Sequence, residues 1–279
     1  MIRIKPEIDA HTHEYIKTGQ IDSKFGLDQK ELVSLVSDLV THPHVDFLGI
    51  HSHIGSQIFD VDPYEELVRK MVGHMVTLKR SLGLEIKELN LGGGFGIQYV
   101  FSDDPPPVPE FLTRITSALK SQCQEEGLSL PKLLLEPGRS IVGSSGLTLY
   151  RVGSVKSIPG IKDYVFVDGG MADNPRPILY QSDYTFHLAH NVHEKELFPY
   201  TIAGKFCESG DVLAHDVMLP KVNVGDILVV YGTGAYNYSM ASNYNRFCRP
   251  AMVTVFDGQA TCIVERETYD DIIRFDLKS

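Results

Sequence analysis

Cysteine pairs, basic clusters and long apolar runs are scarce in this chain, and each shortage excludes a class of protein. The 279 residues include only four cysteines, which lie far apart and form no CxxC pair. Neither a zinc-ribbon site nor the disulfide framework of a small secreted domain is therefore expected, and we expect no metal site. Reduced thiols are expected, as in a cytoplasmic compartment, or a plastid-like one in a eukaryote.

Charge and hydropathy exclude two further classes of partner. The net charge of −10 comes without any run of Lys and Arg, which argues against a nucleic-acid-binding surface. No apolar stretch approaches the roughly 18–20 residues that a membrane helix needs, and no apolar signal-peptide core follows the first basic residues. With 43% hydrophobic and 22% charged residues, we expect a soluble globular protein without nucleic-acid or membrane partners.

Strands and helices are predicted to alternate through the first half. Short apolar runs predict strands at 2–8, 47–51, 86–91 and 132–135. Apolar residues at three- or four-residue spacing predict helices at 28–41, 62–82 and 110–126, with Asp28 as an N-cap. This alternation is typical of a parallel α/β sheet, such as a (β/α)8 barrel with its active site at the C-terminal ends of the strands.

The second half is predicted to be a β domain. Apolar β-type runs occupy 147–158, 164–168, 198–206, 226–231 and 251–264, separated by turns rich in Gly, Asn and Asp. The predicted domains are therefore 1–145 and 146–279. Because a complete barrel takes roughly 250 residues, the first domain corresponds to the second half of a barrel. We expect the natural chain to be longer.

A glycine cluster, Gly92 to Gly96, directly follows the third predicted strand. Glycines allow backbone N–H groups to approach a phosphate closely, and late loops of barrels often form such sites. A tight turn that needs positive φ angles explains the cluster equally well. The spacing matches neither a dinucleotide-binding fingerprint nor a Walker loop.

Two other strand ends carry polar residues. His51 and His53 stand two residues apart, which on a strand places them on one face. A third metal ligand at comparable spacing is missing, so an aromatic ring against a flat cofactor, with Ser56 near a phosphate, is the better functional interpretation. Glu136 and Arg139 offer a carboxylate for a ring nitrogen and a bidentate phosphate partner, or simply a salt-bridged turn.

In this order, the motifs resemble the fold-type III pyridoxal-phosphate-dependent decarboxylases, the family of diaminopimelate, ornithine and arginine decarboxylases. The resemblance covers essentially the whole chain. Its segments are Arg3 to Pro6, Thr18-Gly19, Ser23 to Gly26, His51 to Ser56, Gly92 to Gly96, Glu136 to Arg139, Cys207 to Asp211, and Gly234 to Tyr236. It implies the C-terminal part of an alanine-racemase-like (β/α)8 barrel, then a β-sandwich or Greek-key β-barrel domain. It also implies a homodimer with shared active sites.

The resemblance assigns a cofactor, pyridoxal 5'-phosphate, and the residues that hold it. His53 matches the histidine that stacks on the pyridine ring, and Glu136 the carboxylate on the pyridine nitrogen. The cofactor-binding candidates are His53, Ser56, Gly92, Gly93, Gly94, Glu136, Arg139 and Tyr236.

The resemblance also assigns catalytic residues. Cys207 matches the proposed proton donor and, with Glu208, comes from across the dimer interface, so Cys207, His53 and Glu136 are the catalytic candidates. Lys24 and Asp211 resemble an intersubunit salt bridge.

Substrate choice rests on the segment from Met171 to Tyr180, which resembles the diaminopimelate branch of the family. There Arg176 and Tyr180 would bind a substrate carboxylate, whereas ornithine-type sites typically have Asp at the position of Glu208. The substrate-binding candidates are Arg139, Arg176, Tyr180, Glu208 and Tyr236. The implied reaction is decarboxylation of meso-2,6-diaminopimelate to L-lysine. The alternatives are a sibling basic amino-acid decarboxylase and a non-catalytic dimerising relative.

One family feature has no counterpart in the sequence. The lysine that binds the cofactor covalently lies early in the family's barrel, and no lysine here matches that position. We therefore expect the 279-residue chain to be inactive alone. Truncation of a longer enzyme is favoured over a naturally short chain that acts through a catalytic partner.

Overall fold

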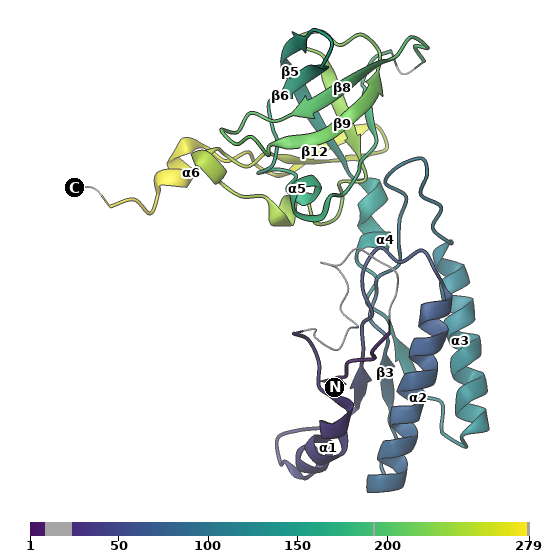
Figure 1. Ribbon diagram of the computed structural model, residues 1–279. Coiled ribbons are helices and arrows are strands. Elements are labelled where there is room, and N and C mark those ends of the chain that lie inside the picture. Colours follow the sequence, from purple (N-terminus) through teal and green to yellow (C-terminus); the bar gives the residue numbers. More distant parts are fainter. Residues whose placement is uncertain (9–23, 192, 278–279) are drawn as a thin grey trace. The chain divides into compact units, whose positions relative to one another are not determined.

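The computed structural model describes residues 1–8, 24–191 and 193–277 (Figure 1). The chain divides into two compact units, Met1–Val142 and Gly143–Ser279. The first unit combines helices with parallel strands and the second consists mainly of antiparallel strands. The predicted order, α/β followed by β, is confirmed. The motif residues Thr18, Gly19 and Ser23 lie outside the described residues.

Unit 1 is built on a parallel sheet of four strands in the order β1-β2-β3-β4. The strands are β1 (Ile2–Arg3), β2 (Gly49–His51), β3 (Glu88–Asn90) and β4 (Lys132–Leu134). The helices are α1 (Leu32–Thr41), α2 (Asp62–Leu82), α3 (Val108–Glu125) and α4 (Arg139–Val142), with a 3-10 turn at Gln29–Glu31 before α1. The 3-10 turn at Gly143–Ser145 already belongs to unit 2. The strands are shorter than predicted. The prediction of a strand over 2–8 was wrong beyond Ile4, which makes only a single bridge with Leu27.

The three long helices of unit 1 form where the apolar spacing predicts them, and α2 has the predicted bounds. Helix α1 begins at Leu32 after a 3-10 turn, and the short helix α4 was not predicted. Helices α2 and α3 lie side by side (Figure 1). They bury one stripe each, where Tyr64 of α2 and Phe111 of α3 pack their rings against Phe95. Gly83 ends α2 in the left-handed conformation with φ 67°. Asp28 caps the turn before α1 as predicted, since its Oδ1 accepts the Lys30 N–H at 2.9 Å.

Unit 2 contains a six-stranded sheet in the order β7-β10-β5-β6-β8-β9 and a two-stranded sheet β11-β12. The strands are β5 (Leu147–Ile158), β6 (Lys162–Val167), β7 (Phe186–Leu188), β8 (Phe198–Ala203), β9 (Val212–Leu219), β10 (Ile227–Tyr231), β11 (Met252–Phe256) and β12 (Gln259–Val264). The short helices are α5 (Arg176–Tyr180) and α6 (Tyr269–Ile273), with 3-10 turns at Tyr238–Met240 and Tyr244–Arg246. Strands β7 and β9 were not predicted, and the run 251–264 is a hairpin of two strands.

No helix in the described part of the chain combines the length and apolar character that a bilayer crossing requires.

Candidate functional site

The carboxyl ends of the unit 1 strands carry polar side chains. His51 is the last residue of β2, Asn90 the last of β3, and Glu136 follows β4 by two residues. The shared-strand interpretation of His51 and His53 was wrong, because β2 ends at His51. The strand-end placement expected of a barrel active site nevertheless holds for these side chains.

Glu136 is oriented by a hydrogen bond from one neighbouring strand and lies near a histidine of another. Asn90 Nδ2 donates to Glu136 Oε1 at 2.9 Å, and His51 Nε2 lies 3.7 Å from Oε2. The other end of the Asn90 amide, Oδ1, accepts the N–H of Gly92 at 2.8 Å. The Glu136 side chain remains 54% exposed, so it is oriented and still accessible to a ligand. Asn90 was missed in the sequence, although a polar residue that closes an apolar strand was a usable signal.

The glycine cluster forms a tight loop pressed against other backbone segments. Gly92 and Gly94 have φ angles of +70° and +101°, which favour glycine. A Cβ at Gly93 would lie 2.0 Å from the carbonyl oxygen of Glu136. The N–H of Gly93 donates to His53 Nδ1 at 3.3 Å, and Tyr64 Oη donates to the Gly93 oxygen at 2.8 Å. Because the Gly92 and Gly93 amides already donate within the protein, phosphate binding by this loop stays a prediction.

Arg139 and Ser56, predicted from distant motifs, lie together. Arg139, the first residue of α4, is only 5% exposed. One of its terminal nitrogens donates to Ser56 Oγ at 2.8 Å and the other donates to the hydroxyl of Tyr99. The guanidinium also lies 5.6 Å from the centre of the Tyr99 ring. Tyr99 was missed, since nothing in its sequence context points to a residue 40 positions away.

The two histidines are held in the neutral form. Burial, and then the nearby charges of Arg3 and His51, lower the pKa of His53 to about 4. The pKa of His51 is lowered too, mainly by burial and against the attraction of Glu136. At neutral pH the His53 ring is therefore an uncharged flat surface.

These residues fit pyridoxal 5'-phosphate. The guanidinium of Arg139 beside the Ser56 hydroxyl suits a phosphate, and the oriented carboxylate of Glu136 suits a protonated pyridine nitrogen. The absence of side chains at Gly92 to Gly94 leaves the loop backbone open to close approach. His53, bonded to that loop, supplies a neutral ring.

A second cluster lies in unit 2 around Arg176, the first residue of α5. Arg176 is 4% exposed and donates to the Tyr184 hydroxyl at 3.0 Å and to Ser182 Oγ at 3.2 Å. Its guanidinium lies 5.8 Å from the ring centre of Tyr180 and 5.9 Å from that of Tyr236. The structure thus gathers three predicted substrate-binding residues. Ser182 and Tyr184, which hold the guanidinium, were missed.

Cys207 and Glu208 lie on the loop between β8 and β9, and both are exposed. The Cys207 N–H donates to Asn245 Oδ1 at 3.4 Å, and the Tyr244 hydroxyl lies 3.4 Å from Glu208 Oε2. Asp211, on the same loop, is 2% exposed, and its carboxylate accepts backbone N–H groups of its own unit. The intersubunit pair of Lys24 and Asp211 therefore stays a prediction.

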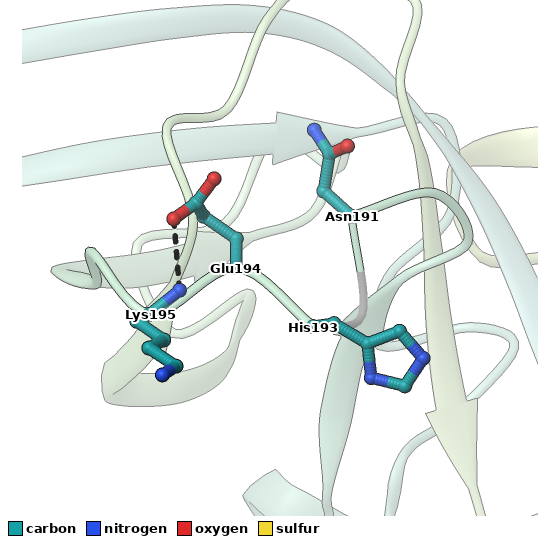
Figure 2. A pocket seen from close by; sticks show the side chains of 4 residues that line it. All are labelled: Asn191, His193, Glu194 and Lys195. Atoms are coloured by element: carbon teal, nitrogen blue, oxygen red, sulfur yellow. Dashed lines mark hydrogen bonds between the residues drawn. The ribbon is translucent and has the colours of Figure 1, made fainter.

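A shallow hollow of about 510 Å³ in unit 2 contains none of the predicted site residues. Figure 2 shows its lining side chains, Asn191, His193, Glu194 and Lys195, pointing in different directions instead of converging. Among the residues that the structure describes, no group of three His, Cys, Asp or Glu could hold a metal ion.

Comparisons with known proteins agree with the geometry of unit 1. Residues 1–143 match the family model "Pyridoxal-dependent decarboxylase, pyridoxal binding domain". The chain is 50% identical over 276 residues to the diaminopimelate decarboxylase of Synechocystis sp., covering 99% of this chain and 59% of that protein. It is 47% identical to the Bacillus subtilis diaminopimelate decarboxylase, covering 99% of this chain and 64% of that protein.

A solved structure gives the same result. The structure of the Helicobacter pylori diaminopimelate decarboxylase complexed with L-lysine superposes with a TM-score of 0.89 at 32% identity, covering 98% of this chain and 66% of that one. The chain thus spans about three-fifths of the length of the curated relatives it matches. By its sequence, its fold and the residues at its strand ends, the chain belongs to the family of pyridoxal-dependent decarboxylases.

Proposed function

We propose that this chain forms the cofactor-binding and substrate-binding part of a diaminopimelate decarboxylase, which converts meso-2,6-diaminopimelate to L-lysine. The observation that carries the proposal is the Glu136 carboxylate, oriented by a hydrogen bond from Asn90 beside the glycine loop. The two curated relatives above support this substrate rather than ornithine or arginine. Residues 1–145 would then form half of the cofactor-binding barrel.

The proposed roles in unit 1 follow from charge and position. Pyridoxal phosphate, when bound, draws electron density from the substrate carbon that loses carbon dioxide. Glu136 would keep the ring nitrogen protonated, and Arg139 with Ser56 would hold the phosphate. His53 would lie against the ring as a neutral imidazole, since its pKa is lowered to about 4. The strand ends and the glycine loop would position these side chains around the cofactor.

The proposed roles in unit 2 concern the substrate. A diaminodicarboxylic acid has two carboxylates and two amines, so its site needs both cationic and anionic side chains. Arg176, with Tyr180 and Tyr236 around its guanidinium, is the proposed partner of one carboxylate. Exposed Glu208 is the proposed partner of the distal amine, and exposed Cys207 the acid that returns a proton after carbon dioxide leaves.

Assembly and location are part of the same proposal. Resemblance to the family supports a cytoplasmic homodimer in which Cys207 and Glu208 of one subunit reach the active site of the other. Two alternatives remain testable: a sibling decarboxylase acting on ornithine or arginine, and a non-catalytic relative that acts by dimerising.

The test is an assay of the natural protein that contains this chain, supplied with pyridoxal phosphate and with diaminopimelate, ornithine or arginine in turn. We expect lysine from diaminopimelate. Putrescine or agmatine as the main product would support the sibling alternative, and no product from any substrate the non-catalytic one.

A paired variant tests the substrate site. Glu208→Ala should lower turnover of diaminopimelate much more than it lowers cofactor affinity. Glu194→Ala, another exposed glutamate of unit 2, is the matched control and should change neither. Equal loss of turnover and cofactor affinity in Glu208→Ala would show that Glu208 is misplaced in the proposal.

A further inference from the structure

One buried carboxylate joins two loops of unit 2 that carry proposed substrate residues. Asp211 Oδ1 accepts the Met171 N–H at 2.7 Å, and its Oδ2 accepts the Phe206 N–H at 2.9 Å. Met171 lies 40 residues earlier in the chain, so the side chain holds segments that are distant in sequence. The N–H of Lys205 also donates to Gly169 O at 3.0 Å. Of the three hydrogen bonds, those of Met171 and Phe206 are accepted by the Asp211 carboxylate, so most of this junction depends on one side chain.

The surroundings of Asp211 are shaped to admit a carboxylate. A Cβ at Gly170 would lie 2.6 Å from both carboxylate oxygens, and a Cβ at Gly204 would lie 2.1 Å from Oδ2. Neither glycine could be replaced without displacing the carboxylate. Burial raises the pKa of Asp211, while the N–H groups of Phe206 and Met171 favour its charged form. Hydrogen bonds to a charged acceptor are about twice as strong as neutral ones.

The joined loops lead directly to the proposed substrate residues. Arg176 begins α5 five residues after Met171, and Cys207 and Glu208 directly follow Phe206. We propose that Asp211 is a positioning residue that fixes both loops, so that the placement of Arg176 and of the Cys207-Glu208 pair depends on one carboxylate. This inference rests on the proposed function only for what the loops bind, because the junction itself lies within unit 2.

Amide hydrogen exchange of the full chain, resolved by NMR, tests the junction. In Asp211→Asn, an NH2 group replaces one acceptor oxygen, so at least one of the Met171 and Phe206 amides should exchange about tenfold faster or more. The matched control is Asp173→Asn. Asp173 is partly buried, and its Oδ2 accepts the N–H of Gly170 within a single loop, at 2.9 Å. In Asp173→Asn the remaining amide oxygen can still accept the single N–H of Gly170, so the Met171 and Phe206 amides should exchange at wild-type rates. Wild-type exchange at both Met171 and Phe206 in Asp211→Asn would overturn the proposal.

A titration of the unmodified protein covers the case in which the variant fails to fold. The Met171 and Phe206 amide protons should shift with one common midpoint, above the ordinary aspartate pKa of 3.8 because burial raises the pKa of Asp211. Within unit 2, the groups that act on this cluster are Glu208, Lys205, Asp173, Asp168 and Tyr150. The Lys24 predicted to pair with Asp211 across a dimer would lower the common midpoint without splitting it. Two separate midpoints would show that one carboxylate does not serve both amides.

Kinetics of the natural protein connect the junction to the substrate. Asp211→Asn should raise the KM for diaminopimelate about tenfold while lowering kcat less. An unchanged KM, combined with faster hydrogen exchange of the Met171 or Phe206 amide, would overturn the positioning role. If the wild-type protein forms no lysine, the proposed function is wrong but the Asp211 junction is still tested, because the amide measurements need neither cofactor nor turnover.

Discussion

Replacement of Gly93 by alanine should destabilise unit 1 severely. The added Cβ would lie 2.0 Å from the Glu136 carbonyl oxygen and 2.7 Å from its carbonyl carbon. That oxygen would have to retreat by more than 1 Å to reach ordinary contact at 3.4 Å. It belongs to backbone whose own N–H is bonded to Gly92 O at 2.8 Å, so no flexible side chain can absorb the movement.

The expected loss is about 3 kcal/mol of unfolding free energy, the upper end for overpacking a well-packed site. Gly73→Ala is the matched control. Gly73 lies exposed within α2, and a Cβ there would meet nothing within 4 Å. Because glycine costs a helix interior about 0.5–1 kcal/mol relative to alanine, this second variant should stabilise the unit.

Urea unfolding followed by circular dichroism at 222 nm is the appropriate assay. The helical signal comes mostly from unit 1, whose helices α1, α2 and α3 have 10, 21 and 18 residues. Gly93→Ala should lower the unfolding midpoint by roughly 1–3 M urea, given typical slopes for small domains. A Gly93→Ala midpoint equal to that of the wild type would refute the close backbone packing of the loop.

Three further predictions concern the side chains around the two clusters. Asn90→Ala should weaken binding of pyridoxal phosphate, measured by fluorescence titration, about tenfold, because Glu136 and Gly92 both lose a hydrogen bond; wild-type affinity would contradict this role. NMR should show His53 neutral down to a pKa of about 4. Because its unfolded pKa is near 6.5, unfolded chains bind more protons between pH 6.5 and 4, and stability should fall by up to roughly 3 kcal/mol as pH drops through that window. A His53 titration near 6.5 would disprove the burial argument. Arg176→Lys should raise the KM for diaminopimelate at least about tenfold, since an ammonium cannot replace the planar fork with which the guanidinium donates to Tyr184 and Ser182; an unchanged KM would remove Arg176 from the substrate site.

Local patterns were sufficient for the three long helices of unit 1 but not for the short helices α4, α5 and α6 or for all strands. The bounds of α2 follow from its spacing alone, because helix hydrogen bonds and the buried stripe both arise within one segment. Strand β9 was missed, because exposed polar residues such as His215 and Asp216 interrupt it and its pairing with β8 is long-range. Strand ends were overestimated where apolar residues lie beyond the ladder, as Ile86 and Leu91 do on either side of β3.

The same distinction applies to the candidate site. Glu136, His53 and the glycine loop could be predicted because each stands at the end of a recognisable strand. The partners that orient them could not all be found in this way. Tyr99 reaches Arg139 across 40 residues, and Tyr184 holds Arg176 from beyond the end of α5, so only the folded chain brings them together.

The double contact of Asn90 has a consequence for redesign of this site. Its amide donates to the side chain of Glu136 and accepts from the N–H of Gly92. A substitution at position 136 therefore also affects the side chain at position 90 and, through it, the glycine loop. A substitution of Glu136 by a basic residue, made to change the electronic character of a bound ring, would set two donors against each other. Position 90 would therefore have to be changed in the same step, to an acceptor such as aspartate, and the loop amide would tolerate that change.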